Sequence, residues 1–174
     1  MLTKPSPTDP SPTDPRPTAS SRTNSGSATP SPTGPSLTLK RRIKAAPDQI
    51  FAAWTDPDKL VRWFGPKDTV AGSVRADVDV RPGGRYRMDF ETANGERHQV
   101  GGVYREVVAG NRLVFTWAWH STPERCSLVT VTLVGDGDGT LLTLHHEQFF
   151  DDKARDGHER GWSGTLDKLE QLFA

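Results

Sequence analysis

The sequence predicts one α+β domain, with a largely antiparallel sheet and a long C-terminal helix, behind a Pro/Ser/Thr-rich tail. Composition changes abruptly at Leu37. Apolar residues then alternate with polar ones in short runs over residues 72–149, separated by Gly- and Pro-containing turns, which is typical of strands. Over residues 152–173 the apolar spacing becomes helical. A chain of 174 residues has room for one ordinary domain plus such a tail.

Residues 1–36 repeat a proline-rich pattern: Ser-Pro-Thr-Asp-Pro occurs at 6–10 and 11–15, and Ser-Pro-Thr-Gly-Pro at 31–35. Leu2 is the only large aliphatic residue in this segment. It cannot bury enough apolar surface to offset the entropy lost on ordering. We therefore expect a disordered tail over residues 1–36 and a folded domain over residues 37–174.

The first part of the domain reads as a strand followed by two short helices. Residues 37–45 alternate well enough for a strand. Pro47 suits the first position of a helix that carries Ile50 and Trp54 at helical spacing. Asp56 and the following proline restart the chain, and a second short helix ends at Gly65-Pro66.

Six further strands are expected after residue 71. The Asn94-Gly95 pair is a strong hairpin signal, and the other connections are also short, which implies an antiparallel meander. In one strand, Leu113, Phe115, Trp117 and Trp119 share a face. The six ranges are roughly 72–80, 85–91, 98–108, 112–120, 127–134 and 140–149.

The C-terminal helix, from about Asp152 to Phe173, has an apolar face that includes Trp162, Leu166 and Leu169. Gly161 and Gly164 interrupt it, each costing roughly 1 kcal/mol relative to alanine. Such glycines indicate either the close approach of another element or room for a ligand. The sequence leaves both interpretations open.

Charge and cysteine content exclude several classes of function. Lys plus Arg and Asp plus Glu number 22 each, so we expect no nucleic-acid partner and no membrane partner. Cys126 is the only cysteine, which suits a reducing compartment. With no apolar signal segment near the N-terminus, we expect a cytoplasmic protein.

His145 and His146 are adjacent in a strand and point to opposite faces, so we expect no metal site.

The order of strand, two short helices, six strands and long helix is that of the helix-grip fold. There a curved seven-stranded antiparallel sheet wraps the C-terminal helix and leaves a cavity between them. The sequence also resembles bacterial relatives of the C-terminal domain of the heat-shock-protein-ninety ATPase activator. These belong to the SRPBCC superfamily, which includes START, polyketide-cyclase and Bet v allergen-like proteins. The similar segments are 54–57, 60–66, 79–86, 102–107, 113–117, 140–144 and 161–169.

The resemblance implies a binding protein for a small hydrophobic or aromatic molecule, held in a cavity between sheet and helix. Aromatic side chains on the predicted inner faces are the candidates for lining it, and no cofactor is implied. A homodimer is left open. The candidate ligand-binding residues are Phe90, Tyr104, Trp117, Trp119 and Trp162.

Two other functions are open. An enzyme of the cyclase, dehydratase or hydrolase type would use a cavity histidine beside a carboxylate as general base. The weak catalytic candidates are His145, His146 and Glu147, with His120 and His158 behind them. The sequence does not decide whether His145 or His146 faces the cavity. We expect a binding protein rather than an enzyme.

The third function, a co-chaperone role, follows from the family name alone. The eukaryotic activator has a separate N-terminal domain where this chain has its tail, which argues against chaperone activation. For Trp63-Phe64-Gly65-Pro66 we favour a structural role, in which the two aromatic rings lock a short helix onto the sheet.

Overall fold

The computed structural model describes residues 34–174. The tail was predicted to be disordered over residues 1–36, and of these only 34–36 lie within the described range. Those three residues contact the domain, because the carbonyl of Pro35 accepts a hydrogen bond from the N–H of Phe149. The described structure therefore begins slightly before the predicted boundary at Leu37.

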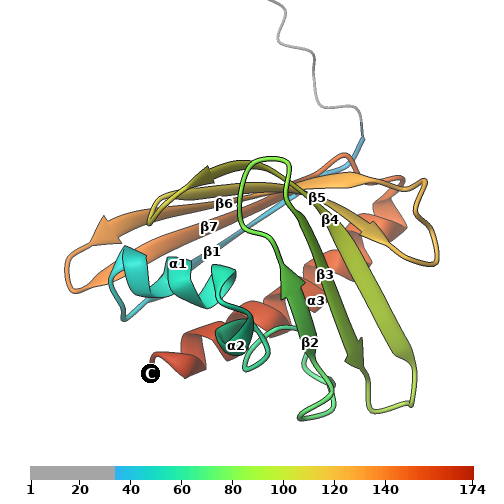
Figure 1. Cartoon of the computed structure of the whole chain (residues 1–174), viewed down its shortest axis with the longest axis horizontal. Coiled ribbons are helices and arrows are strands. Elements are labelled where there is room, and N and C mark those ends of the chain that lie inside the picture. Colours follow the sequence, from blue (N-terminus) through green and yellow to red (C-terminus); the bar gives the residue numbers. More distant parts are fainter. Residues whose placement is uncertain (1–33) are drawn as a thin grey trace, which may run out of the picture.

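The sheet has seven antiparallel strands in the order β1-β7-β6-β5-β4-β3-β2 (Figure 1). Strands β2 to β7 form the predicted meander, and β1 adds to the far edge by pairing with β7. The helix-grip architecture is thus confirmed. The strands are β1 (Leu37–Ile43), β2 (Arg75–Val78), β3 (Arg85–Glu91), β4 (Arg97–Val108), β5 (Arg112–Trp119), β6 (Ser127–Asp136) and β7 (Gly139–Glu147).

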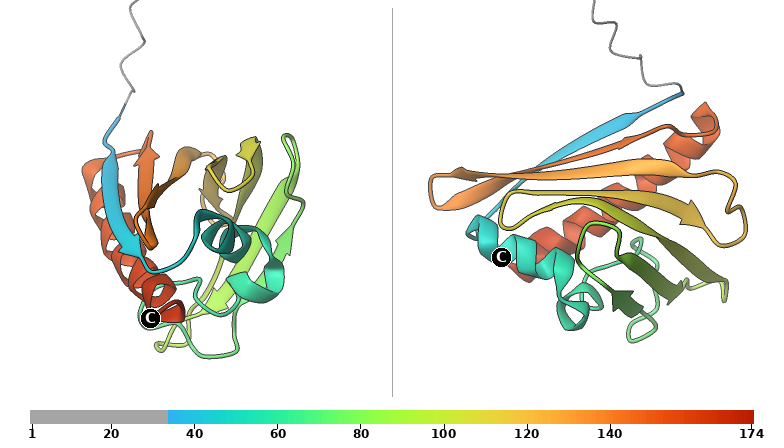
Figure 2. Two further views of the ribbon diagram at one scale, coloured as in Figure 1. Left: turned by 90° about the vertical axis from the view of Figure 1, so that its left-hand side faces the viewer. Right: turned by 45° about the horizontal axis from the view of Figure 1, so that its top comes forward.

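Three helices accompany the sheet, which curves around them (Figures 1 and 2). Helix α1 (Pro47–Thr55) begins at the expected proline, and α3 (Asp152–Leu172) begins after Asp151, whose carboxylate accepts from the N–H of Ala154. Helix α2 (Pro57–Leu60) is shorter than expected, because the chain leaves regular helical geometry in turns after Leu60.

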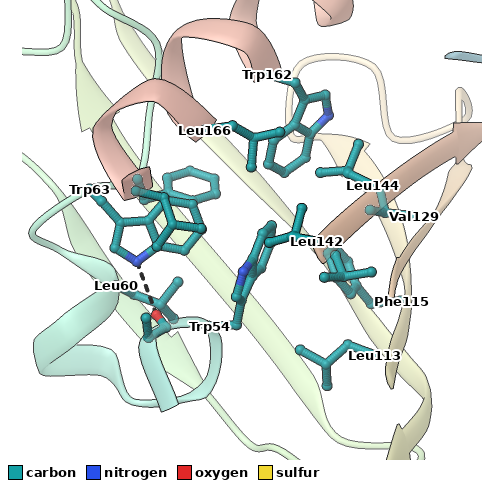
Figure 3. Packing of buried hydrophobic residues seen from close by; sticks show 14 of the residues in the cluster. Trp54, Leu60, Trp63, Leu113, Phe115, Val129, Leu142, Leu144, Trp162 and Leu166 are labelled. Atoms are coloured by element: carbon teal, nitrogen blue, oxygen red, sulfur yellow. Dashed lines mark hydrogen bonds between the residues drawn. The ribbon is translucent and has the colours of Figure 1, made fainter. Parts of the chain in front are cut away.

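The core lies between the concave face of the sheet and the three helices, and it is rich in aromatic rings (Figure 3). Trp54 of α1 contacts Trp63 edge to face, with ring centroids 4.7 Å apart. The indole N–H of Trp63 donates to the carbonyl of Ala53 at 3.0 Å. Trp63 is fully buried, so this residue locks the segment after α2 onto α1, which agrees with the structural role expected for it.

The loop after α2 is fastened to α3. The ammonium group of Lys168 donates to the carbonyls of Phe64 and Pro66, both at 3.3 Å. A Cβ added to Gly164 would lie 3.1 Å from the backbone nitrogen of Lys67. Gly164 is therefore explained by close approach of this loop, which is one of the two interpretations that the sequence left open.

Trp63 and Trp54 form a matched pair for measuring the contribution of a buried hydrogen bond. Trp54 is buried too, but its indole N–H has no partner among residues 34–174. Both Trp→Phe changes remove similar apolar volume. We expect Trp63→Phe to lower the free energy of unfolding by about 1 kcal/mol more than Trp54→Phe, measured by urea denaturation. Equal losses, or a greater loss for Trp54→Phe, would contradict the packing described.

Candidate functional site

An open cleft of about 840 Å³ lies beside the N-terminal half of α3. Its other walls come from the ends of β3, β4 and β5 and from the loop after α2. By contrast, the void inside the core measures only about 30 Å³, room for about one water molecule. The space between the sheet and α3 is thus an open cleft at one end of the sheet, and tryptophan and tyrosine rings fill the interior behind it.

Four of the five candidate ligand-binding residues line the cleft: Phe90, Trp117, Trp119 and Trp162. Their rings touch, since the centroids of Trp117 lie 5.0 Å from Trp162 and 5.6 Å from Trp119. Tyr104 lies elsewhere. It borders the small internal void and packs between other core rings, and burial raises its pKa to about 12.

His146, on β7, is fully buried behind the cleft and uses both ring nitrogens. Its Nδ1 accepts from the indole N–H of Trp162 at 3.0 Å. Because an indole can only donate, Nδ1 is unprotonated and Nε2 carries the proton. Nε2 then donates to the hydroxyl of Ser127 at 2.7 Å, and that hydroxyl donates to the carbonyl of Trp117 at 3.2 Å. No lone pair of this imidazole is free to take a proton from a ligand.

His158, on α3, has the opposite tautomer. Its Nδ1 lies 2.7 Å from the carbonyl of Ala154, which can only accept, so Nδ1 carries the proton. Its Nε2 accepts from the indole N–H groups of Trp119 at 2.9 Å and Trp117 at 3.2 Å. His158 therefore lines the cleft with a lone pair that is already shared by two donors.

Both imidazoles are held neutral. Burial lowers the pKa of His146 well below its usual value, and the neighbouring His158 and His145 lower it further. Burial also lowers the pKa of His158, against an opposing effect of its hydrogen bond to Ala154. The ring centroids of His146 and His158 lie 5.2 Å apart, so a positive charge on one imidazole disfavours protonation of the other.

The remaining catalytic candidates lie away from the cleft. The strand register places His146 inward with Leu144, so His145 faces outward. There Nε2 of His145 lies 2.8 Å from the carboxylate of Glu147, and Nδ1 lies 2.8 Å from the hydroxyl of Thr38. His120 is exposed. In residues 34–174, neither His146 nor His158 has a carboxylate among its hydrogen-bond partners, which a histidine–carboxylate general base would require.

The face of α3 that borders the cleft has two positions without a side chain. Gly157 and Gly161 both line the cleft. A Cβ at Gly161 would meet nothing within 4 Å, and one at Gly157 would meet only the guanidinium of Arg160 at 4.0 Å. Neither glycine has a positive φ. Packing and backbone geometry therefore do not require glycine at these two positions, unlike at Gly164, and their effect is to widen the cleft.

Sequence reasoning missed three participants. Ser127 forms a hydrogen bond with His146. It could have been noticed in the sequence as a polar residue on the same inward face of its strand as Val129 and Val131. Phe64 packs in the core and also lines the cleft, beyond the structural role expected for it. His98 lines the cleft and stacks on Phe90, with centroids 5.0 Å apart, and no sequence signal singled it out.

Within residues 34–174, no three His, Cys, Asp or Glu side chains are grouped to hold a metal ion. None of the helices in that range is long and apolar enough to cross a bilayer.

Fold and cleft together define a helix-grip protein with an open, aromatic-floored cleft. Residues 44–174 match the model of the family described as Activator of Hsp90 ATPase homolog 1-like protein, and the chain belongs to this family. The family lies in the SRPBCC superfamily, as the sequence resemblance indicated, and its fold is that of ligand-binding domains. No curated protein matches the chain.

Several solved bacterial structures are similar to this chain. Protein CV1439 from Chromobacterium violaceum is 29% identical, with a TM-score of 0.68 over 80% of this chain and 97% of that one. The AHSA1 protein SPO3351 from Silicibacter pomeroyi is 28% identical, with a TM-score of 0.66 over 79% and 96%. CalU16 from Micromonospora echinospora is 27% identical, with a TM-score of 0.61 over 80% and 76%.

The neutral histidines predict acid sensitivity with a definite sign. Both have a folded-state pKa below the unfolded value of about 6.5, so their contribution to stability is fully present above that pH. As pH falls below about 6.5, the unfolded chain takes up protons that the folded chain does not. The free energy of unfolding should fall by up to about 1.4 kcal/mol per pH unit for each histidine.

Urea denaturation at several values between about pH 7.5 and pH 5 measures this slope. His158→Gln should reduce it, because the glutamine side chain can accept an indole N–H but does not titrate. A His158→Gln variant that keeps the full wild-type slope would show that His158 is not held neutral.

Proposed function

We propose that this protein binds a small, largely apolar ligand with a flat aromatic body in the cleft beside α3. The observation that carries the proposal is the pair of unexplained glycines, Gly157 and Gly161, opposite the aromatic floor. Each lowers helix stability by roughly 1 kcal/mol relative to alanine. Such a loss of helix stability, at positions where packing does not require glycine, is consistent with space kept open for a ligand.

The floor suits a flat ring. Trp117, Trp119 and Trp162 have their indole N–H groups bound to histidines, so what they offer a ligand is apolar ring surface. Most of it belongs to the half-buried Trp119, because Trp117 and Trp162 are largely covered by the core. The hydrogen bonds also fix the rings before the ligand arrives, which reduces the entropy lost on binding. A concave, largely apolar site with few polar groups is typical of small-molecule binding.

The same contacts favour binding over catalysis. The lone pair of His146 and that of His158 are both occupied by indole donors. A general base needs a free lone pair within hydrogen-bond reach of the substrate. The cleft can hold and orient a molecule, and His146 and His158 act as fixed acceptors for the three tryptophans.

Neutral 2-naphthamide is a suitable probe, because it has a flat apolar body and no charge. Titrated into the ¹⁵N-labelled full-length chain, it should shift the amide signals of Gly157 and Gly161 and the indole signal of Trp119. A ligand of this size should bind with a dissociation constant of about 1 mM or tighter. Shifts confined to residues outside the cleft, or none, would contradict the proposal.

Substitution of Gly161 separates binding from stability. Gly161→Ala should raise the free energy of unfolding by up to about 1 kcal/mol, because alanine favours the helix and meets no neighbour. Gly161→Leu should prevent 2-naphthamide binding while the protein stays folded, because its side chain would occupy the cleft. Gln171→Leu, at an exposed position of the same helix, is the matched control and should bind normally. Unchanged binding by Gly161→Leu would place the ligand elsewhere.

A further inference from the structure

The part of α3 that borders the cleft carries two cations, one before Gly157 and one after it. Lys153, Gly157 and Arg160 follow one another at spacings of four and three residues, so they lie along one face of the helix. All three border the cleft. Lys153 and Arg160 are two helical turns apart, about 10 Å along the axis. A ligand lying across the glycines would therefore have a positive charge near each end of its contact with α3.

These cations have no ionic partner. Within residues 34–174, no carboxylate lies within 4.0 Å of Lys153, Arg160 or the third cleft cation, Lys67. Their neighbour on the same helix, Arg155, is paired with both Asp152 and Asp156. Carboxylates are thus available on this part of α3 and engage the arginine outside the cleft.

The two carboxylates that line the cleft are placed differently. Glu96 belongs to the turn between β3 and β4, across the cleft from α3, and lies 3.8 Å from the imidazole of His98. Asp68 belongs to the loop after α2. Burial lowers the pKa of Lys168, and the charge of Asp68 partly opposes that effect. Glu96 and Asp68 each have a basic group nearby, whereas Lys153 and Arg160 have no acidic partner in the part of the chain that the structure describes.

From this arrangement we propose that the ligand is an aromatic acid, whose carboxylate or similar anionic group pairs with Lys153 or Arg160 at one end of its contact with α3. The inference rests on the proposed function, because it assigns the charged end of the molecule whose flat body lies on the tryptophan floor. Arginine suits the recognition of a carboxylate through paired N–H donors, and lysine adds a mobile positive charge.

Three isosteric probes test this in the full-length chain: 2-naphthoate, neutral 2-naphthamide and cationic 2-naphthylmethylamine. Their affinities are compared by the NMR titration described above. We expect 2-naphthoate to bind about fivefold tighter than 2-naphthamide, the gain of one partly exposed ion pair. The preference should shrink as salt is added, because ions screen exposed charges.

The variant Lys153→Gln/Arg160→Gln should lose the preference for 2-naphthoate and bind 2-naphthamide as the wild type does. The matched control is Lys40→Gln/Arg105→Gln. It makes the same change in net charge at two exposed cations outside the cleft, and it should keep the preference.

The outcomes distinguish the two proposals. If none of the three probes binds in the cleft, the proposed function fails. If 2-naphthamide binds but 2-naphthoate binds no tighter, or the amine binds tightest, the proposed function stands and the acid preference is wrong. A preference that persists in Lys153→Gln/Arg160→Gln would also overturn the assignment to α3.

Discussion

The arrangement depends on one constraint: indole N–H groups that are buried among apolar side chains need acceptors. Three tryptophans, at 117, 119 and 162, point their N–H groups toward two imidazoles. Each imidazole can accept only at an unprotonated nitrogen, so both His146 and His158 must be neutral. Those five rings, contributed by β5, β7 and α3, join the C-terminal helix to the sheet by directional bonds as well as by apolar packing.

This constraint determines what kind of site the protein has. With their N–H groups turned toward the histidines, the tryptophans present apolar ring surface to the cleft. With their lone pairs occupied, the histidines cannot act as bases. The result is a rigid aromatic floor beside Gly157 and Gly161 of α3, where the helix backbone has no side chain. The open space lies at one end of the sheet, because the aromatic core fills the middle almost completely.

Much of the fold could be predicted from residue patterns. Alternation located the strands to within a few residues, and Asn94-Gly95 marked its hairpin. The pairing of β1 with β7 joins segments about 100 residues apart, which no local pattern encodes. The shortness of α2 was missed, because tertiary contacts of Trp63 replace regular helix there.

The site was harder to predict, for a physical reason. Four aromatic lining residues could be chosen from their inward faces, but Tyr104 has the same alternation and lies at the internal void. Strand period alone gives the face of a residue and not its distance from the open end of the sheet. The choice between His145 and His146 needed the register of β7, and the partners of His146 come from two other elements, β6 and α3.

The tautomers of the two buried histidines test the central claim most directly. Long-range ¹H–¹⁵N NMR spectra distinguish a protonated ring nitrogen from an unprotonated one by chemical shift. At about pH 7, His146 should carry its proton on Nε2 and His158 on Nδ1, each with its other nitrogen unprotonated. Either histidine in the opposite tautomer, or doubly protonated, would mean that the indole groups are not held as described and that the cleft floor is organised differently.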